Sequence, residues 1–259
     1  MQTALEERRD QIVKRLAVTQ FASVGELARQ LGYSVATIKR DLLELERQGM
    51  VRRTRGGAVP ITQNRIDVPY FMKLASTGDE RGKDGLAGIA RHLLRDDMTI
   101  VLDSSTTCLH LIPQLARFQG IHVITNGVVT AAMLSEQTNA EVCILGGVVS
   151  PHHQTINGAK AYNDMLTYAA DLALLSCRGF DAGGGASEIK EGEALMKQAM
   201  RRQTTEVALL VTASKWGERY VYQSLRCTDI DYLITDAELS DADMTSLDSS
   251  NIEVMQPGA

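Results

Sequence analysis

The chain has 259 residues, of which 44% are hydrophobic and 23% are charged, and its net charge is −5. This composition is typical of a globular protein that buries an ordinary core, and the length suits a small domain followed by a larger one. No apolar run approaches the ~20 residues that span a bilayer, and the first residues contain no apolar signal core, so we expect a cytoplasmic protein.

Charge is distributed unevenly along the chain. Residues 1–60 contain 11 basic and 7 acidic residues, a net charge of +4. Residues 61–259 contain the other 16 basic and 25 acidic residues, a net charge of −9. A basic head on an acidic body is expected when only the head contacts a polyanion such as DNA.

Helical patterns occupy most of the head. Apolar residues at positions 5, 12, 13 and 16 predict a first helix. Ser23 followed by Glu26 is a capping box, which predicts that a second helix runs from Val24 to about Gln30.

A third helix follows a tight turn at Gly32. Ser34 caps this helix, which is predicted to run from Val35 to about Gln48, and Gly49 fits its C′ position. Two short helices around a glycine turn predict a helix-turn-helix.

Projection of the third helix separates an apolar stripe from a polar face. The predicted stripe consists of Val35, Ile38, Leu42 and Leu45. The outward residues of its first half carry a methyl group, hydroxyl groups and positive charges, which suit base edges and phosphates of the major groove. These candidate DNA contacts are Ser34, Ala36, Thr37, Lys39 and Arg40. For this helix alone, an ordinary solvated face is the alternative.

Residues 50–59 predict a short hairpin, or wing, because arginines and two glycines alternate with residues that favour strands. Its basic side chains can lie along phosphates or enter a minor groove. The candidate contacts here are Arg52, Arg53, Arg55 and Gly56. A helix pair followed by a basic wing indicates a winged helix-turn-helix DNA-binding domain over residues 1–60.

Residues 61–80 are mixed in composition and predict a linker. From residue 81 to residue 259, short apolar runs alternate with helical patterns, which predicts a mostly parallel sheet covered on both faces. The predicted strands are 99–102, 122–125, 142–145, 172–176, 207–211 and 232–235, and the clearest helices are 86–94, 128–134 and 194–202.

Polar residues and glycines follow five of these strands. Ligands of such sheets bind beyond the carboxyl ends of the strands, and a helix that begins with hydroxyl residues offers donors to an anion. We therefore predict a site for a phosphorylated polyol. Its candidate residues are Asp103, Ser104, Ser105, Thr106, Thr107, Asn126, Gly146, Gly147, Arg178 and Lys215.

The run Ser34-Val-Ala-Thr-Ile-Lys-Arg-Asp-Leu, continued by Gly49, Arg52-Arg53 and Gly56-Gly57-Ala58, resembles the signature of the DeoR/GlpR family of bacterial regulators. The resemblance extends to Asp103-Ser-Ser-Thr-Thr and Ser214-Lys-Trp-Gly in the body. It implies an α/β effector domain similar in fold to ribose-phosphate isomerase, which senses phosphorylated sugars, and a repressor of a neighbouring catabolic operon.

The resemblance also implies roles for individual residues. Ser104 to Thr107 would hold the phosphate, and Asp103, Asn126 and Lys215 would contact the sugar or order the loops. Lys83 matches a lysine at the start of the family's effector domain. Glu193 and Lys197 match a polar helix, where we expect them to form an i,i+4 ion pair.

The chain departs from the family pattern at three positions. Ser105 stands where a glycine is usual, Arg178 where an acidic residue is usual, and Thr212 where an aspartate is usual. Two acids are lost and one arginine is gained, so we expect an effector more anionic than a simple sugar monophosphate, such as a sugar acid phosphate or a bisphosphate.

No cofactor or metal is predicted. The four cysteines form no CxxC pair, which favours free thiols, and His152-His153 after Pro151 favours a surface turn. An isomerase-like enzyme with an accessory DNA-binding domain is the alternative function, because Asp103 and Asp181 remain as carboxylates. A dinucleotide-binding protein is disfavoured by the lack of a GxGxxG motif. We expect a symmetric homo-oligomer, a dimer or tetramer, on repeated half-sites of double-stranded operator DNA.

Overall fold

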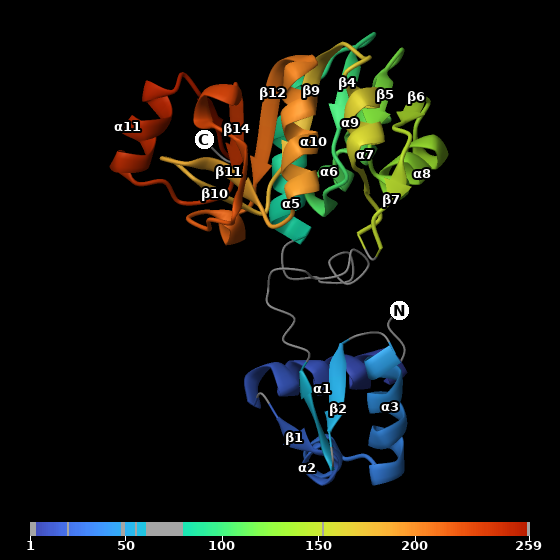
Figure 1. Ribbon diagram of the computed structural model, residues 1–259. Coiled ribbons are helices and arrows are strands. Elements are labelled where there is room, and N and C mark those ends of the chain that lie inside the picture. Colours follow the sequence, from blue (N-terminus) through green and yellow to red (C-terminus); the bar gives the residue numbers. More distant parts are fainter. Residues whose placement is uncertain are drawn as a thin grey trace. The chain divides into compact units, whose positions relative to one another are not determined.

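The computed structural model describes residues 4–257, apart from 20, 48–49, 55, 61–79 and 152. The chain forms two compact units that divide between Val68 and Pro69 (Figure 1). Nearly all of the predicted linker, and Gly49 at the predicted helix end, lie outside the described residues. None of the helices in the described part is long and apolar enough to cross a membrane.

The described part of the smaller unit combines three helices with a three-stranded antiparallel sheet, which confirms the predicted winged helix-turn-helix. The helices are α1 (Ala4–Thr19), α2 (Val24–Leu31) and α3 (Val35–Arg47). The strands, in the order β1-β3-β2, are β1 (Ala22–Ser23), β3 (Gly57–Pro60) and β2 (Val51–Thr54). The two-residue strand β1 was not predicted.

The predicted caps set the bounds of α2 and α3. Ser23 Oγ accepts a hydrogen bond from the Glu26 backbone at 3.2 Å, and the Glu26 carboxylate accepts one from the Ser23 backbone at 2.8 Å. Gly32 ends α2 in the left-handed region with φ of 73°. Ser34 Oγ then accepts a bond from the backbone of Thr37 at 3.1 Å and caps α3. The capping chemistry thus fixes the turn between the two helices.

The predicted apolar stripe of α3 is wrong at one residue, Val35. Ile38, Leu42 and Leu45 are buried as expected, but Val35 is 48% exposed and Asp41 is only 1% exposed. At about 100° per residue, Val35 lies about 60° from Ile38 on one side and Asp41 about 60° on the other. The helix is therefore rotated so that the Asp41 edge faces the core and the Val35 edge faces outward.

Gly57 allows strand β3 of the hairpin to lie close to β1, with which it pairs. The strands of the hairpin pair Thr54 with Gly57 and Arg53 with Ala58. A Cβ at Gly57 would collide with the carbonyl oxygen of Ala22, which belongs to β1. A side chain here would separate the wing from the helices.

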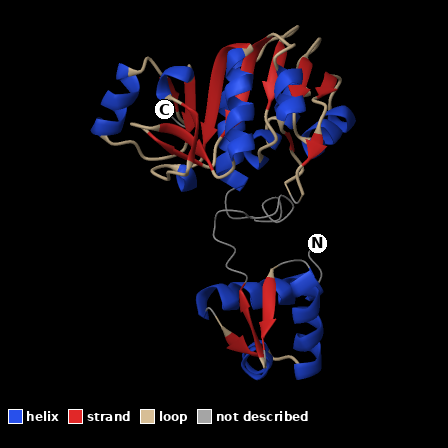
Figure 2. Ribbon diagram, viewed as in Figure 1, coloured by secondary structure: helices blue, strands red, loops and turns tan. Residues whose placement is uncertain are grey.

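The larger unit contains a seven-stranded, fully parallel sheet in the order β15-β14-β12-β9-β4-β5-β6, which confirms the predicted fold class (Figure 2). Six strands match the predictions: β4 (Thr99–Leu102), β5 (His122–Thr125), β6 (Glu141–Ile144), β9 (Ala170–Ser176), β12 (Thr204–Val211) and β14 (Tyr232–Thr235). The seventh, β15 (Glu253–Met255), was not predicted.

Two small antiparallel sheets accompany the main sheet, and neither was predicted. One has the order β10-β11-β13, with β10 (Gly179–Asp181), β11 (Gly185–Glu188) and β13 (Tyr222–Leu225). The other is the pair β7 (Val148–Val149) and β8 (Ile156–Asn157).

Helices cover both faces of the parallel sheet. Alternate strand residues divide between two buried cores, with Ile100 and Leu102 in one and Val101 in the other. The first core includes residues of α5 (Glu80–Ala90), α6 (Thr106–Leu109), α7 (Ile112–Leu115) and α8 (Val128–Gln137). The second includes residues of α9 (Ala159–Met165), α10 (Glu191–Arg202) and α11 (Asp241–Ser249). The described part of this unit also contains three single-turn 3-10 helices, η2 (Arg91–Leu93), η3 (Ala213–Lys215) and η4 (Cys227–Asp229).

Candidate functional site

The outer face of α3 carries the predicted contacts of the helix-turn-helix. Ser34, Ala36, Lys39 and Arg40 are exposed, and Thr37 is half-buried because it lies against the cap. On the wing, Arg53 and Gly56 are exposed. The side chain of Arg52 and the whole of Arg55 lie outside the described residues. The described candidates therefore form an accessible polar surface on one helix and the adjoining hairpin.

Asp41 fixes the orientation of this surface. Its buried carboxylate lies 2.6 Å from Arg8 Nε and 3.3 Å from Arg9 Nε, and both arginines belong to α1. Arg8 also stacks on the ring of Tyr33 at 4.8 Å. Through these two ion pairs Asp41 joins α3 to α1. The outward direction of Arg40 is therefore set by an ion pair beneath it.

The wing is also attached to α3. The backbone of Arg53 donates to the Glu46 carboxylate at 2.8 Å, and its guanidinium lies 3.8 Å from the same carboxylate. This second contact is long and exposed, so it holds the guanidinium only weakly. Arg53 thus keeps its charge available on the surface, while its backbone ties the hairpin to the helix.

In the larger unit, all the strands that precede the predicted effector residues run parallel, so their carboxyl ends meet at one edge of the sheet. Three groups of contacts occupy this edge. They are a buried ion cluster around Lys197, a hydroxyl pair around Lys215, and a hydrogen-bonded junction at Thr155.

The buried cluster joins one lysine to two carboxylates. Lys197 Nζ on α10 lies 3.1 Å from Asp103 and 3.2 Å from Glu188. Asp103 also accepts hydrogen bonds from the backbones of Ser105 at 2.7 Å and Ser176 at 3.0 Å. Asp103 therefore orders the loop after β4, which is one of its two expected roles.

The surroundings separate the pKa values of these two carboxyl groups. Burial raises the pKa of Asp103, but the charge of Lys197 and the hydrogen bonds from Ser105 and Ser176 outweigh it, so the net direction is downward. Burial raises the pKa of Glu188 to about 7, and the charge of Lys197 only partly offsets this effect. One ammonium thus keeps one carboxylate ionised while the other holds its proton more tightly.

Glu188 should make the stability of the larger unit depend on pH. Its pKa is about 7 when folded, against an ordinary value of 4.5, so the folded state binds the proton more tightly. This stabilisation is complete below pH 4.5 and is lost as the pH rises through about 7. Urea unfolding at pH 5 and pH 8, followed by the fluorescence of the single tryptophan, Trp216, should show a smaller pH effect in Glu188→Gln than in wild type. Equal pH effects in the two proteins would contradict this assignment.

Lys215 is held by hydroxyl groups. Its Nζ donates to Thr107 Oγ1 at 2.8 Å and to Ser176 Oγ at 2.7 Å. Within the described part of the chain, no carboxylate forms an ion pair with it. The structure therefore brings Lys215, which follows β12, onto the start of α6, which follows β4.

Thr155 joins two of the predicted loops. Its Oγ1 lies 3.0 Å from Ser104 Oγ and 2.9 Å from Asn126 Nδ2, and both groups donate to it. Beside this junction, Asn126 Oδ1 and Thr130 Oγ1 are buried without a hydrogen-bond partner among the described residues. Buried polar atoms are rarely left this way, so the junction has capacity for a further polar group.

The remaining predicted residues contribute differently. Ser105 Oγ accepts a bond from Cys108 and caps α6, which has only four residues, so the expected helix-terminus effect on an anion is small. Thr106, the first residue of α6, is half-buried. Gly146 donates its backbone N–H to Asp164 at 2.7 Å, and Gly147 packs closely on Ile156.

Arg178 and Thr212 are two of the positions that depart from the family pattern. Arg178 follows β9, is half-buried, and donates its backbone N–H to Ser187 at 3.2 Å. Thr212 follows β12, is fully buried, and shares a hydrogen bond with Ser214 at 2.9 Å.

One sequence prediction in this region is wrong, and a second is right for the backbone but not for the side chain. The ion-pair partners of Lys197 in the described residues are Asp103 and Glu188, not Glu193, because Lys197 points into the sheet edge. His153 lies in a turn as predicted, with its backbone N–H bonded to the Ser150 carbonyl oxygen at 3.3 Å, but its side chain is buried, with Nε2 2.6 Å from Lys190 Nζ. His152 lies outside the described residues.

All four cysteines are free, as predicted. No group of three or more His, Cys, Asp or Glu residues within the described ranges is arranged to hold a metal ion. Sequence reasoning missed Glu188, Ser176 and Thr155, whose roles depend on neighbours distant in the chain.

Comparison with known proteins supplies independent matches for both units. A DeoR-like helix-turn-helix domain matches residues 8–64, and a DeoR C terminal sensor domain matches residues 79–237. The regulator GlpR of Haloferax volcanii is 31% identical over 96% of both chains. The repressor GlcR of Bacillus subtilis is 30% identical over 96% of this chain and 95% of its own. Ribose 5-phosphate isomerase A of Methanocaldococcus jannaschii overlaps 54% of this chain and 55% of its own, with 19% identity and a TM-score of 0.39.

Proposed function

Because the chain belongs to the DeoR family of helix-turn-helix transcriptional regulators, we propose that it represses a carbohydrate-catabolism operon and releases its operator when an anionic sugar derivative binds. The family makes the chain a DNA-binding regulator with a sensor domain, and not an enzyme. In this proposal residues 1–60 bind the operator, residues 61–80 link the domains, and residues 81–259 bind the effector and form the oligomer.

The DNA-binding surface consists of the first half of α3 and the wing. Arg40 is exposed on a helix that Asp41 anchors from below, so it can pair with a guanine edge in the major groove. Lys39 and the wing arginines Arg52, Arg53 and Arg55 contact phosphates or the minor groove. One head makes few base contacts, so two or more heads of a homo-oligomer read repeated half-sites.

The effector proposal rests on the hydrogen-bond partners and the charge of Lys215. Its ammonium group is partly buried, bonds two hydroxyl groups, and lies within 3 Å of Thr107, which follows β4. Lys197 is already matched by two carboxylates, whereas Lys215 has only neutral oxygens as hydrogen-bond partners among the described residues. A phosphate at the loop 104–107 would supply the missing negative charge.

The junction at Thr155 suits the polyol part of the ligand. Among the described residues, Asn126 Oδ1 and Thr130 Oγ1 have no partner. The Asn126 oxygen can accept a hydrogen bond from a sugar hydroxyl group, and the Thr130 hydroxyl can accept or donate one. Arg178 and Thr212 stand where the family resemblance leads us to expect acids, which adds positive charge near this edge. A bisphosphate or a sugar acid phosphate therefore fits the site better than a monophosphate.

Calorimetry on the full-length protein tests the effector class. We expect a sugar bisphosphate or a sugar acid phosphate to bind more tightly than the monophosphate, and the neutral sugar to bind least. Lys215→Met should weaken the best ligand by about tenfold or more, since a hydrogen bond to a charged group contributes about 1.5–3 kcal/mol. Operator binding without ligand should be unchanged in this variant.

The matched control is Lys14→Met, an exposed lysine on α1 in the smaller unit. It should retain wild-type affinity for the ligand. Tighter binding of the neutral sugar than of its phosphates would overturn the proposed effector class. Equal losses in the two lysine variants would remove Lys215 from the site.

A further inference from the structure

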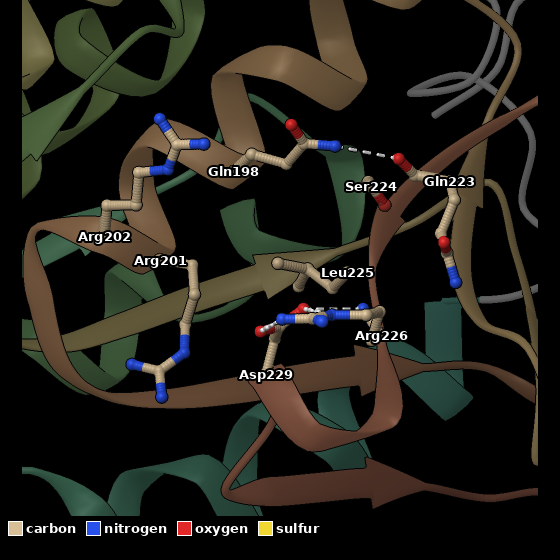
Figure 3. Close-up of a pocket in the computed structure, with 8 residues that line it drawn as sticks. All are labelled: Gln198, Arg201, Arg202, Gln223, Ser224, Leu225, Arg226 and Asp229. Carbon is tan, nitrogen blue, oxygen red and sulfur yellow. Dashed lines mark hydrogen bonds and ion pairs between the residues drawn. The ribbon is translucent and has the colours of Figure 1, made fainter.

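A polar pocket lies in the larger unit, away from the loops that follow the parallel strands. Its cavity volume is about 340 Å³, and it is formed between the last turns of α10 and the segment 223–229 (Figure 3). Helix α10 ends at Arg202, and β12 begins two residues later at Thr204, so the pocket lies towards the amino-terminal ends of the strands. The proposed effector site is at the opposite, carboxyl edge.

The charge of the pocket is predominantly positive. Arg201, Arg202 and Arg226 line it, together with a single carboxylate, Asp229. Arg226 holds that carboxylate with two side-chain hydrogen bonds of 3.1 Å, which leaves two guanidinium groups without a carboxylate of their own in the pocket. Burial raises the pKa of Asp229, but the bonds from Arg226 and the charge of Arg201 outweigh it and the pKa is lowered.

The arginines retain donors for a ligand. Arg201 donates one bond to the carbonyl oxygen of Thr204 at 3.2 Å, and Arg202 donates one to the Tyr162 hydroxyl at 2.6 Å. A guanidinium has five N–H donors in a planar fork that matches phosphate and carboxylate oxygens. Arg226 is held in a fixed direction by Asp229, so its remaining N–H groups are already positioned.

Ser224 supplies independent evidence that the pocket can bind a further polar group. It lies in a β-bulge, because Ala186 pairs with Leu225 while Ser187 pairs with Gln223. Ser224 is only 2% exposed, lines the pocket, and its Oγ has no hydrogen-bond partner among the described residues. A bulge commonly redirects a side chain beside a binding site, and a buried hydroxyl without a partner calls for one.

We propose that this pocket binds a small polyanion bearing phosphate or carboxylate groups, at a site separate from that of the effector. Arg201 and Arg226 hold the charged oxygens, Ser224 bonds one of them, and the Gln198 carboxamide, which donates to the backbone carbonyl oxygen of Gln223 at 3.0 Å, lies beside them. Helix α10 connects the two sites, because it carries both Lys197 of the buried ion cluster and the pocket residues Arg201 and Arg202. A ligand at one site can therefore influence affinity at the other through this helix.

Calorimetric titration of the full-length protein with pyrophosphate, and separately with citrate, tests the proposal. We expect wild type to bind at least one of the two, and Arg201→Gln and Ser224→Ala each to weaken that binding by tenfold or more. Arg219→Gln is the matched control, because Arg219 is a well-exposed arginine outside the pocket. Thermal unfolding of each variant checks that the fold is intact.

Lys215→Met separates this site from the effector site. We expect it to bind the probe with wild-type affinity, even if the proposed effector response fails. The proposal is overturned if wild type binds neither probe, if Arg201→Gln and Ser224→Ala bind as wild type does, or if Lys215→Met alone abolishes binding. The last result would place the anion at the carboxyl edge.

Discussion

Replacing Lys197 with methionine is expected to lower the free energy of unfolding of the larger unit by about 3–5 kcal/mol, the usual cost of breaking a buried ion pair. The substitution leaves Asp103 and Glu188 beside one another, both at least 95% buried, without the ammonium that separates their charges. Glu188 can take up a proton, but Asp103 then keeps only its two backbone donors. Urea unfolding followed by Trp216 fluorescence reports on this unit, because Trp216 packs on Phe180 within it.

The double variant Lys197→Met, Glu188→Gln provides the control for charge. It removes one carboxylate together with the lysine, so its loss of stability should be smaller than that of Lys197→Met alone. Lys160→Met, at an exposed position, should change the free energy of unfolding by less than about 0.5 kcal/mol. A loss below about 1 kcal/mol in Lys197→Met would show that the cluster is not the anchor that its distances indicate.

Replacing Arg40 with alanine is expected to cost about 1–3 kcal/mol per half-site on the preferred duplex, which corresponds to roughly 5- to 150-fold in affinity. The guanidinium is exposed on α3 while Asp41 and Ile38 hold the helix from below. Binding to random duplexes should change little, because base contacts discriminate and phosphate contacts do not. Fluorescence anisotropy with labelled duplexes measures both affinities.

Arg53→Ala is the matched comparison, since it removes a guanidinium from the wing. Its side chain is exposed and only weakly held by Glu46. We expect weaker binding to all duplexes alike and a reduction of about 1 in the slope of affinity against salt. If Arg40→Ala and Arg53→Ala behave identically, the division between base reading and phosphate contact is wrong.

Local signals in the sequence were sufficient for most of the fold. The capping box at Ser23 and Glu26 sets the start of α2, and continuous apolar runs identify six of seven parallel strands. Strand β15 has three residues, and its half-buried and exposed side chains give no apolar run. The strands of the sheet β10-β11-β13 also give no strand pattern in the sequence. They are short and contain glycine and polar residues that become buried only in the tertiary structure.

The sequence predicted where the candidate sites lie, but not which side chains bond to one another there. Parallel strands bring Thr107 and Lys215 together although 108 residues separate them, and the strand pattern alone indicated that edge. Glu188 gave no signal, because its burial depends on Lys197 nine residues later and on Asp103 in another loop. The i,i+4 rule paired Lys197 with Glu193, and this prediction was wrong. The rule describes side chains on an exposed helix face, whereas Lys197 faces the edge of the sheet.

The most direct test of the account is competition between duplexes for the purified full-length protein. A duplex selected from random sequence for binding should be preferred over random competitor by about 10³-fold or more at physiological salt. A bisphosphate or sugar acid phosphate should weaken that complex in wild type and much less in Lys215→Met. Equal affinity for selected and random duplexes, with and without these metabolites, would contradict the account.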